Sequence, residues 1–221
     1  MKIFVATAKL DDVRWAADAA IADGVVTTPM LLATEAGGGD GRDVLAEICR
    51  TATVPVCATV TAISGGDIYR EGRDLARLDD RLIVQVPLVE DAPAAVRRLA
   101  DEGVRVAVTF VYSAAQALLA AKAGATMITT SLDQLDANGY GGAATLSEIR
   151  GIFDVYDIEC DLMASQPHNP SQFASCALAG ADAVTVTPTV LRSLLLHPLT
   201  DRSVDQYLSE LAKRPKVRAT V

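Results

Sequence analysis

The sequence predicts a (β/α)8 barrel, a fold in which eight parallel strands alternate with helices. Short runs rich in Val and Ile alternate with longer runs rich in Ala, Leu and Arg along the chain of 221 residues. The short runs are continuously apolar, as expected for parallel strands that helices cover. The expected strands are Ile3–Ala6, Gly24–Thr27, Val54–Val60, Leu82–Val86, Val104–Thr109, Thr126–Thr130, Ile158–Ala164 and Ala183–Thr187.

The repeated strand–helix units favour a closed barrel. A doubly wound open sheet is the alternative, because periodicity does not distinguish a closed sheet from an open one. The first expected strand is followed by Ala6-Thr7-Ala8-Lys9, and not by the glycine-rich turn of dinucleotide-binding sheets.

Capping motifs mark several helix boundaries. Ser113 with Gln116, and Thr145 with Glu148, have the spacing of capping boxes. Asn169 precedes a first-turn proline, which is typical of a helix start. Three glycines separate an expected helix from the next strand, where a left-handed residue commonly ends a helix: Gly103, Gly124 and Gly180.

We expect a single domain over residues 1–221, because the length suits one domain and no linker interrupts the pattern. A last helix is expected at Ser203–Ala212, beyond the eighth unit. Its apolar side chains recur at helical spacing and need a partner surface, either the barrel itself or another subunit. They are Val204, Tyr207, Leu208 and Leu211.

The composition argues against several classes of protein. A net charge of −8 disfavours a nucleic-acid partner, which needs clustered Lys and Arg. No apolar stretch is long enough for a membrane span, and no signal pattern begins the chain, so a cytoplasmic location is expected. The four scattered cysteines and two histidines form no metal-ligand spacing, so neither a metal nor another cofactor is expected.

Several motifs in collinear order resemble the transaldolase family, especially its short fructose-6-phosphate-aldolase branch. The resemblance extends from Met1 to about Pro198 and implies a barrel and small-molecule aldol chemistry. The matching segments are Gly24–Pro29, Ala107–Gln116, Ala121–Ala125, Leu135–Gly139 and Cys176–Asp182.

The resemblance places the Schiff-base lysine of the family at Gln85, in the run Ile83-Val84-Gln85-Val86-Pro87. Glutamine has no basic amine and cannot form an iminium. Thr109 matches the family pattern, whereas the other polar positions of the family hold different residues here. Those positions are Ala6, Thr28, Thr59, Ser131, Gln134 (for the phosphate-binding arginine) and Gln166.

A set of neutral side chains near strand ends is therefore the candidate site, since active sites of such barrels lie there. Gln85, Ser131 and His168 are the candidate catalytic residues. His168 follows the seventh strand, where it could carry a proton. The alternatives are a buried structural amide at Gln85 and a loop-packing role for His168. The candidate substrate-binding residues are Thr28, Thr59, Thr109, Gln134 and Gln166. Thr129 is also expected to point inward.

Other reactive side chains have simpler interpretations. Cys57 should point into the barrel below Thr59 as a small core residue. Asp133 and Glu90 follow strands and could act as bases, but a helix cap or a solvated loop is the more common role of such residues. Lys9 lies in a loop and is a poor substitute for the missing amine.

Three functions remain open from the sequence. The first is a divergent enzyme without Schiff-base chemistry that acts on a polar carbonyl- or polyol-bearing molecule in a specialised biosynthetic pathway, by a lyase, isomerase, dehydration or cyclisation step. The second is a non-catalytic binding or regulatory homologue, and the third is conventional aldolase or transaldolase activity. The resemblance also implies a homo-oligomer, pentameric or decameric, with residues 203–221 at the subunit interface.

Overall fold

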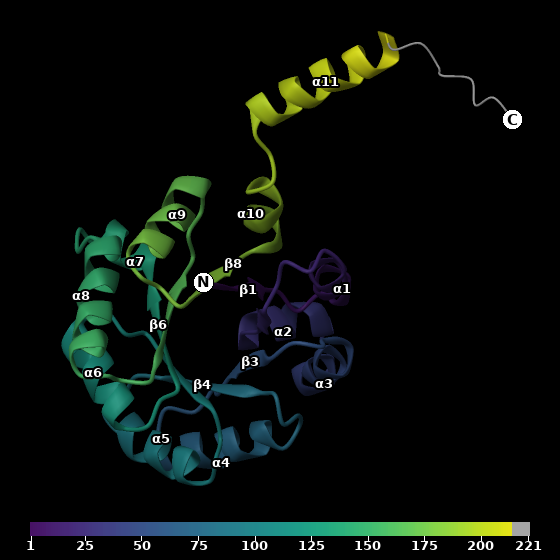
Figure 1. Cartoon of the computed structure of the whole chain (residues 1–221). Helices are drawn as coiled ribbons and strands as arrows, with labels where there is room; N and C mark the ends of the chain where they lie inside the picture. Colours follow the sequence, from purple (N-terminus) through teal and green to yellow (C-terminus); the bar gives the residue numbers. More distant parts are fainter. Residues whose placement is uncertain (214–221) are drawn as a thin grey trace, which may run out of the picture.

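The computed structural model describes residues 1–213 and forms a closed barrel in which the strands are parallel and follow one another in sequence order (Figure 1). The predicted (β/α)8 fold is confirmed, and the open-sheet alternative is wrong. Residues 214–221 lie outside the described part, so the expected subunit contact of the tail stays a prediction. The strands are β1 Lys2–Ala6, β2 Gly24–Val26, β3 Val56–Thr59, β4 Ile83–Pro87, β5 Val106–Thr109, β6 Met127–Ser131, β7 Asp161–Ser165 and β8 Ala183–Val186.

The barrel closes between its first and last strands. β1 pairs with β2 on one side and with β8 on the other, with Phe4 opposite Thr185 in the second ladder. Since all eight strands run in the same direction, their carboxyl ends meet at one mouth.

The helices form a ring around the strands (Figure 1). Two helices, α2 and α3, fill the connection after β2, and a short helix, α7, directly follows β6; these additions were not predicted. The helices are α1 Leu10–Asp18, α2 Pro29–Ala36, α3 Gly41–Thr51, α4 Gly65–Ala76, α5 Ala92–Asp101, α6 Ala114–Lys122, α7 Leu132–Ala137, α8 Gly142–Val155, α9 Pro170–Leu178, α10 Pro188–Ser193 and α11 Pro198–Lys213.

The predicted cap of α9 is confirmed. Asn169 Oδ1 accepts a hydrogen bond from the backbone N–H of Gln172 at 2.9 Å, while Gln172 Oε1 accepts one from the N–H of His168 at 2.8 Å. Ser113 likewise caps α6 by accepting from the N–H of Gln116 at 3.3 Å. The three predicted glycine C-caps all have left-handed backbone angles.

The capping box predicted at Thr145 is wrong. Thr145 lies inside α8, which begins three residues earlier at Gly142, and its hydroxyl donates to the carbonyl of Gly141 at 3.3 Å. Asp136 Oδ1 instead accepts from the N–H of Gly142 at 2.7 Å. The start of α8 is thus fixed by a side chain from α7, which no local motif could reveal.

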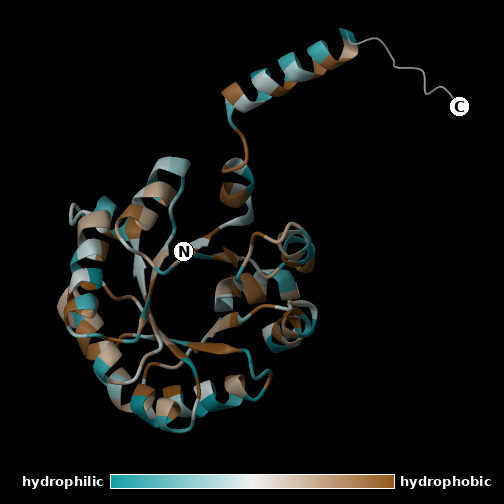
Figure 2. Cartoon of the chain, viewed as in Figure 1, coloured by the Kyte–Doolittle hydropathy of each residue, from teal (hydrophilic) through white to brown (hydrophobic). Residues whose placement is uncertain are grey.

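Hydrophobic side chains form two separate cores. The larger core lies between the strands and the helices, and the hydropathy colouring shows apolar helix faces turned toward the strands (Figure 2). The smaller core fills the inside of the barrel with one residue from each strand. Its members are Phe4, Val26, Cys57, Ile83, Ala107, Met127, Met163 and Ala183.

The last helix stands away from the barrel. The predicted helix at Ser203–Ala212 is confirmed as part of the longer α11, and no residue of α11 is buried. His197 begins it as a cap, because its Nδ1 accepts from the N–H of Leu199 at 3.1 Å. Figure 1 shows α11 extending beyond α10 without contact with the ring of helices. Within residues 1–213, no helix combines the length and hydropathy of a membrane span.

The interior core depends on a glycine in β2. A Cβ atom on Gly24 would lie 2.2 Å from the Phe4 ring, closer than any real contact. We therefore expect Gly24→Ala to lower the free energy of unfolding by about 1–3 kcal/mol, through overpacking. Gly151→Ala is the control, since a Cβ there meets no atom within 4 Å. This control should raise stability by about 0.5–1 kcal/mol. Urea unfolding measures both changes, and equal stability of Gly24→Ala and the wild type would contradict the proposed packing.

Candidate active site at the barrel mouth

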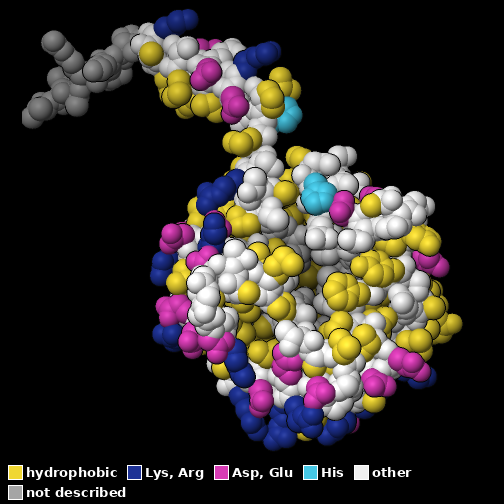
Figure 3. All heavy atoms as spheres, turned by 180° about the vertical axis from the view of Figure 1, so that it is seen from behind, with side chains coloured by type: hydrophobic (Ala, Val, Ile, Leu, Met, Phe, Trp, Pro, Cys, Tyr) yellow, Lys and Arg dark blue, Asp and Glu magenta, His cyan; other side chains and the backbone are white. Residues whose placement is uncertain are grey.

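Neutral polar side chains gather at the carboxyl ends of the strands. Gln85, Thr109, Thr129 and Ser131 are all at least nine-tenths buried. Figure 3, seen from the side opposite to Figure 1, shows a hollow at the centre of the barrel with hydrophobic side chains around it. The mouth is therefore a recess with uncharged polar groups at its base.

Gln85 is held by a threonine of the neighbouring strand. Its side chain is 3% exposed, and its Oε1 accepts a hydrogen bond from Thr59 Oγ1 at 3.0 Å. Among the described residues, none accepts a hydrogen bond from the Gln85 amide nitrogen. A buried amide with one end fixed and two N–H donors unused can present those donors to a carbonyl oxygen.

A second polar pair joins β6 to the segment after β7. Ser131 Oγ donates to Gln166 Oε1 at 2.8 Å and also accepts from the N–H of Gln134, which caps α7. The inward strand position predicted for Gln166 is wrong, because Gln166 follows the end of β7 with a left-handed φ of 64°. Ser165, the last residue of β7, was not predicted as an inward-facing residue. It is two positions after Met163, which faces the barrel interior, so strand alternation would have identified it.

His168 pairs with a carboxylate at the rim of the mouth. Its Nε2 lies 3.1 Å from Asp133 Oδ1, and both side chains are partly exposed. From the sequence, Asp133 could be a base, a helix cap or a solvated loop residue; in the structure it pairs with His168. A carboxylate bound to one ring nitrogen fixes the orientation of the imidazole and leaves Nδ1 for another partner.

The remaining predicted binding residues are not part of these pairs. Thr28 Oγ1 accepts from the N–H of Leu31 and caps α2. Thr109 Oγ1 donates to the carbonyl of Val86 at 3.4 Å. Gln134 is exposed and lines a cavity of about 420 Å³ between the starts of α6 and α7, together with Tyr112 and Tyr140.

Thr129 adds an unpaired hydroxyl to the mouth. Its Oγ1 is buried and has no hydrogen-bond partner among the described residues. Strand alternation places Thr129 on the inner side of β6 with Met127 and Ser131. A buried hydroxyl without a partner is costly, so Thr129 is suited to hydrogen-bond a molecule that enters the barrel.

Cys57 is a core residue, as predicted. It is fully buried in the inner core, and burial raises the pKa of its thiol to about 12. The thiolate is the nucleophilic form of cysteine, so a thiol with this pKa is inert near neutral pH.

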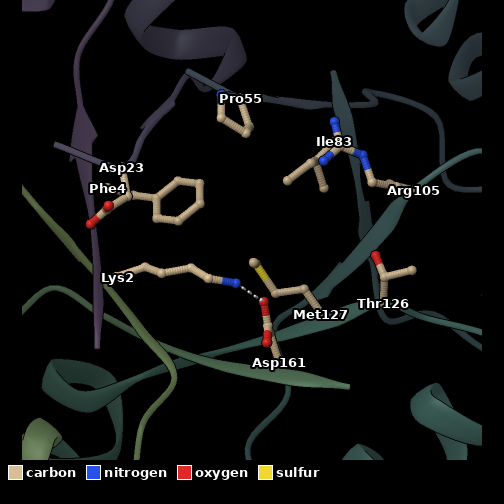
Figure 4. Close-up of a pocket in the computed structure, with 9 residues that line it drawn as sticks. All are labelled: Lys2, Phe4, Asp23, Pro55, Ile83, Arg105, Thr126, Met127 and Asp161. Atoms are coloured by element: carbon tan, nitrogen blue, oxygen red, sulfur yellow. Dashed lines mark hydrogen bonds and ion pairs between the residues drawn. The ribbon is translucent and has the colours of Figure 1, made fainter. Parts of the chain in front are cut away.

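A cavity of about 320 Å³ at the opposite end of the barrel contains Lys2 (Figure 4). Lys2 Nζ forms an ion pair with Asp161 Oδ2 at 2.9 Å, and this hydrogen bond raises the pKa of the Lys2 ammonium group. Asp23 in the same cavity accepts from the backbone N–H of Ile3 at 2.8 Å. Lys2 therefore lies at the amino-terminal end of the barrel, opposite to the end where Gln85 lies.

The other described lysines also lie outside the barrel interior. Lys9 is exposed at the start of α1, Lys122 ends α6, and Lys213 ends α11. No group of three or more His, Cys, Asp or Glu side chains in residues 1–213 could hold a metal ion. The chemistry available at the mouth is hydrogen bonding by amides and hydroxyls, with one histidine–carboxylate pair at the rim.

The protein is a closed (β/α)8 barrel with a polar recess at the carboxyl ends of its strands. In enzymes with this fold, the active site lies at that end of the barrel. Residues 3–219 match the family described as Transaldolase/Fructose-6-phosphate aldolase, and the chain belongs to that family.

Curated relatives match over nearly their whole length. A protein named "Probable transaldolase" from Hyphomonas neptunium is 42% identical over 213 residues, which cover 96% of this chain and 98% of the relative. Proteins with the same name from Parvibaculum lavamentivorans and Desulfosudis oleivorans are 40% and 38% identical, over 96% and 98% of this chain and 97% and 100% of the relatives.

Proposed function

We propose that this member of the family acts on a polar small molecule that carries a carbonyl group or several hydroxyls, and that it does so without a Schiff base. The observation that carries the proposal is the buried Gln85 at the end of β4, in the place that the family resemblance assigns to the reactive lysine. An amide can hydrogen-bond a carbonyl oxygen but cannot attack its carbon.

In the proposed site, Gln85 orients the substrate. Its oxygen is occupied by Thr59, so its amide N–H groups are directed to the substrate carbonyl. Donors that are fixed before the substrate arrives stabilise negative charge on that oxygen without reorganisation. The buried hydroxyl of Thr129 is available as a further donor or acceptor.

His168 is the proposed proton carrier. Asp133 holds its Nε2 at 3.1 Å, which leaves Nδ1 to exchange a proton with the substrate or with a water. Asp133 acts here through His168 and is a positioning residue. Ser131 ends β6 and Gln166 follows β7, so they lie beside Asp133 and His168, and their hydrogen bond holds this side of the mouth together.

The neutral character of the mouth favours an uncharged substrate. The family resemblance assigns the phosphate-binding arginine to Gln134, and an amide cannot form the charge-assisted bidentate contacts of a guanidinium with phosphate. The proposed reaction is a lyase, isomerase, dehydration or cyclisation step in a specialised biosynthetic pathway.

Two other functions compete with this proposal. The names of the relatives favour transaldolase chemistry. The hydrogen bonds that Gln85 and Ser131 already make within the protein are compatible with a binding or regulatory homologue that has no catalytic step.

We also propose that the chain forms a homo-oligomer through α11, as the family resemblance implies for a pentamer or decamer. The apolar stripe of α11 does not lie against its own barrel: Val204, Tyr207 and Leu208 are 48%, 60% and 56% exposed. An apolar stripe of this kind is expected to be buried against another surface, and a second copy of the chain supplies one.

Trapping with borohydride separates Schiff-base chemistry from the proposed function. We expect that dihydroxyacetone phosphate and borohydride leave the mass of the wild-type protein unchanged, since no amine stands at position 85. Gln85→Lys is the matched control, and we expect it to gain a reduced adduct on residue 85 without robust aldol cleavage, because Ala6, Thr28 and Ser131 are unchanged. A stoichiometric adduct on any wild-type lysine would contradict the proposal, and an adduct on Lys9 would identify a relocated amine.

Light scattering tests the proposed assembly. The wild type should elute as an oligomer, and Leu208→Asp should shift it toward smaller species, because a charge in an apolar interface is costly. Gln206→Asp on the same helix is the control and should change little, because the Gln206 side chain is exposed and polar and donates a hydrogen bond to Glu210. A monomeric wild type at working concentration would contradict the proposed role of α11.

A further inference from the structure

A cavity of about 420 Å³ lies between the starts of α6 and α7, the helices that follow β5 and β6. We call it the α6–α7 cavity. Its volume is within the range of small-molecule sites, and neither Gln85 nor His168 is among its lining residues. A ligand can therefore bind in this cavity without contact with the residues proposed to orient the substrate and to carry the proton.

The ring of Tyr140 is exposed although its backbone is fixed. α7 ends in a Schellman turn, in which the N–H of Gly139 donates to the carbonyl of Asp136 at 3.0 Å and the N–H of Tyr140 donates to the carbonyl of Leu135 at 2.9 Å. A side chain at this position commonly packs against the helix end, yet Tyr140 is 74% exposed and lines the cavity. The turn thus holds an aromatic ring at the edge of an open space.

Tyr112 supplies a second aromatic side chain, from the segment between β5 and α6. Phe110 in this segment has a left-handed φ of 61°, which is uncommon for an aromatic residue. The backbone N–H of Tyr112 donates to Gln116 Oε1 at 2.8 Å, and this bond ties the segment to the first turn of α6. Tyr112 and Tyr140 therefore line one cavity with flat apolar faces and polar edges.

Two amide side chains of the cavity are each fixed at one end. Gln116 Oε1 is bound to the N–H of Tyr112, so the Nε2 end of this amide remains as a donor. Asn138 Nδ2 donates to the carbonyl of Gln134 at 2.8 Å, so the Oδ1 end of this amide remains as an acceptor. The cavity thus offers one fixed donor and one fixed acceptor, which are the complements of a C=O group and an N–H group.

The side chains around the α6–α7 cavity favour a neutral, flat ligand. In the described part of the chain, its lining residues include no Lys, Arg, His, Asp or Glu. A heterocyclic base stacks on an aromatic side chain through its flat face, and its ring amide groups can also pair with Gln116 and Asn138. A sugar can lie against the same faces, but each of its hydroxyls both donates and accepts, so a sugar gains nothing from a fixed donor and a fixed acceptor.

We propose that the α6–α7 cavity binds a neutral planar heterocycle with N–H and C=O groups in its ring, the chemical class of the pyrimidine bases. The ring lies against Tyr112 and Tyr140, Gln116 donates to a ring carbonyl, and Asn138 accepts from a ring N–H. This inference goes beyond the proposed function and does not depend on it, because Gln85 and His168 do not line the cavity.

Three related ligands test the inference on the full wild-type chain. We titrate uracil, 1,3-dimethyluracil and 5,6-dihydrouracil and follow the side-chain amide resonances of Gln116 and Asn138 by NMR. Uracil should shift both sets of signals saturably. 1,3-Dimethyluracil keeps the flat ring but has no N–H, and it should bind about fivefold more weakly. 5,6-Dihydrouracil keeps both amide groups but loses the planar aromatic ring, and it should bind about tenfold more weakly.

Two results of this series would overturn the inference. The first is the absence of saturable shifts with uracil, and the second is equal affinity for all three ligands. Methyl β-glucopyranoside represents the competing class of ligand. If it saturates the Gln116 and Asn138 signals at a lower concentration than uracil does, the proposed ligand class is wrong.

Tyr140→Ala removes an aromatic face from an exposed position and should weaken uracil binding by about tenfold. Tyr140→Phe keeps the face and should bind uracil as the wild type does. Tyr156→Ala is the matched control, because Tyr156 is 70% exposed at the end of α8 and does not line the cavity. Equal uracil affinity of Tyr140→Ala and Tyr156→Ala would contradict the role given to the ring. The ligand series needs no variant and decides the question if Tyr140→Ala does not fold.

Gln85→Ala separates this inference from the proposed function. The variant should bind uracil as the wild type does, while it loses the shift of the Thr129 signals with dihydroxyacetone. If uracil binds to the wild type and dihydroxyacetone leaves the Gln85 amide signals unchanged, the proposed function fails alone. If uracil does not bind while dihydroxyacetone shifts the Gln85 signals, the cavity inference fails alone.

Discussion

The pairing of β1 with β8 is the constraint on which the rest of the structure depends. Closure of the ladder brings the carboxyl ends of all strands to one mouth, so that the Thr59–Gln85 pair of β3 and β4 and the Ser131–Gln166 pair at β6 and β7 belong to one recess. The same closure creates an interior narrow enough for one residue per strand to fill. An open sheet would leave these pairs on separate stretches of an edge.

The mouth combines buried polarity with an absence of charge at its base. Gln85 and Thr129 are both buried. Thr129 Oγ1 has no hydrogen-bond partner among the described residues, and a buried hydroxyl without a partner costs free energy. An ionisable pair, His168 with Asp133, lies at the partly exposed rim.

The strands could be predicted from the sequence because buried parallel strands are apolar throughout. The starts of two helices could be predicted because Asn169 and Ser113 cap them locally. The prediction failed at Thr145, where the helix start is set by Asp136 of another helix. The inward strand position expected for Gln166 was also wrong, because this residue follows the strand end with a left-handed backbone. The pairing of His168 with Asp133 could not be predicted, since it joins segments that follow two different strands and depends on how those strands pack.

The side-chain amide resonances of Gln85 test directly whether Gln85 binds the carbonyl group. On titration with dihydroxyacetone, we expect the Gln85 amide signals to shift with the same saturation curve as the Thr129 signals, because both groups contact the ligand at the mouth. The amide of Gln206 on α11 is an internal reference and should not move. Saturable shifts elsewhere in the spectrum with an unchanged Gln85 amide would contradict the claim that Gln85 binds the carbonyl group.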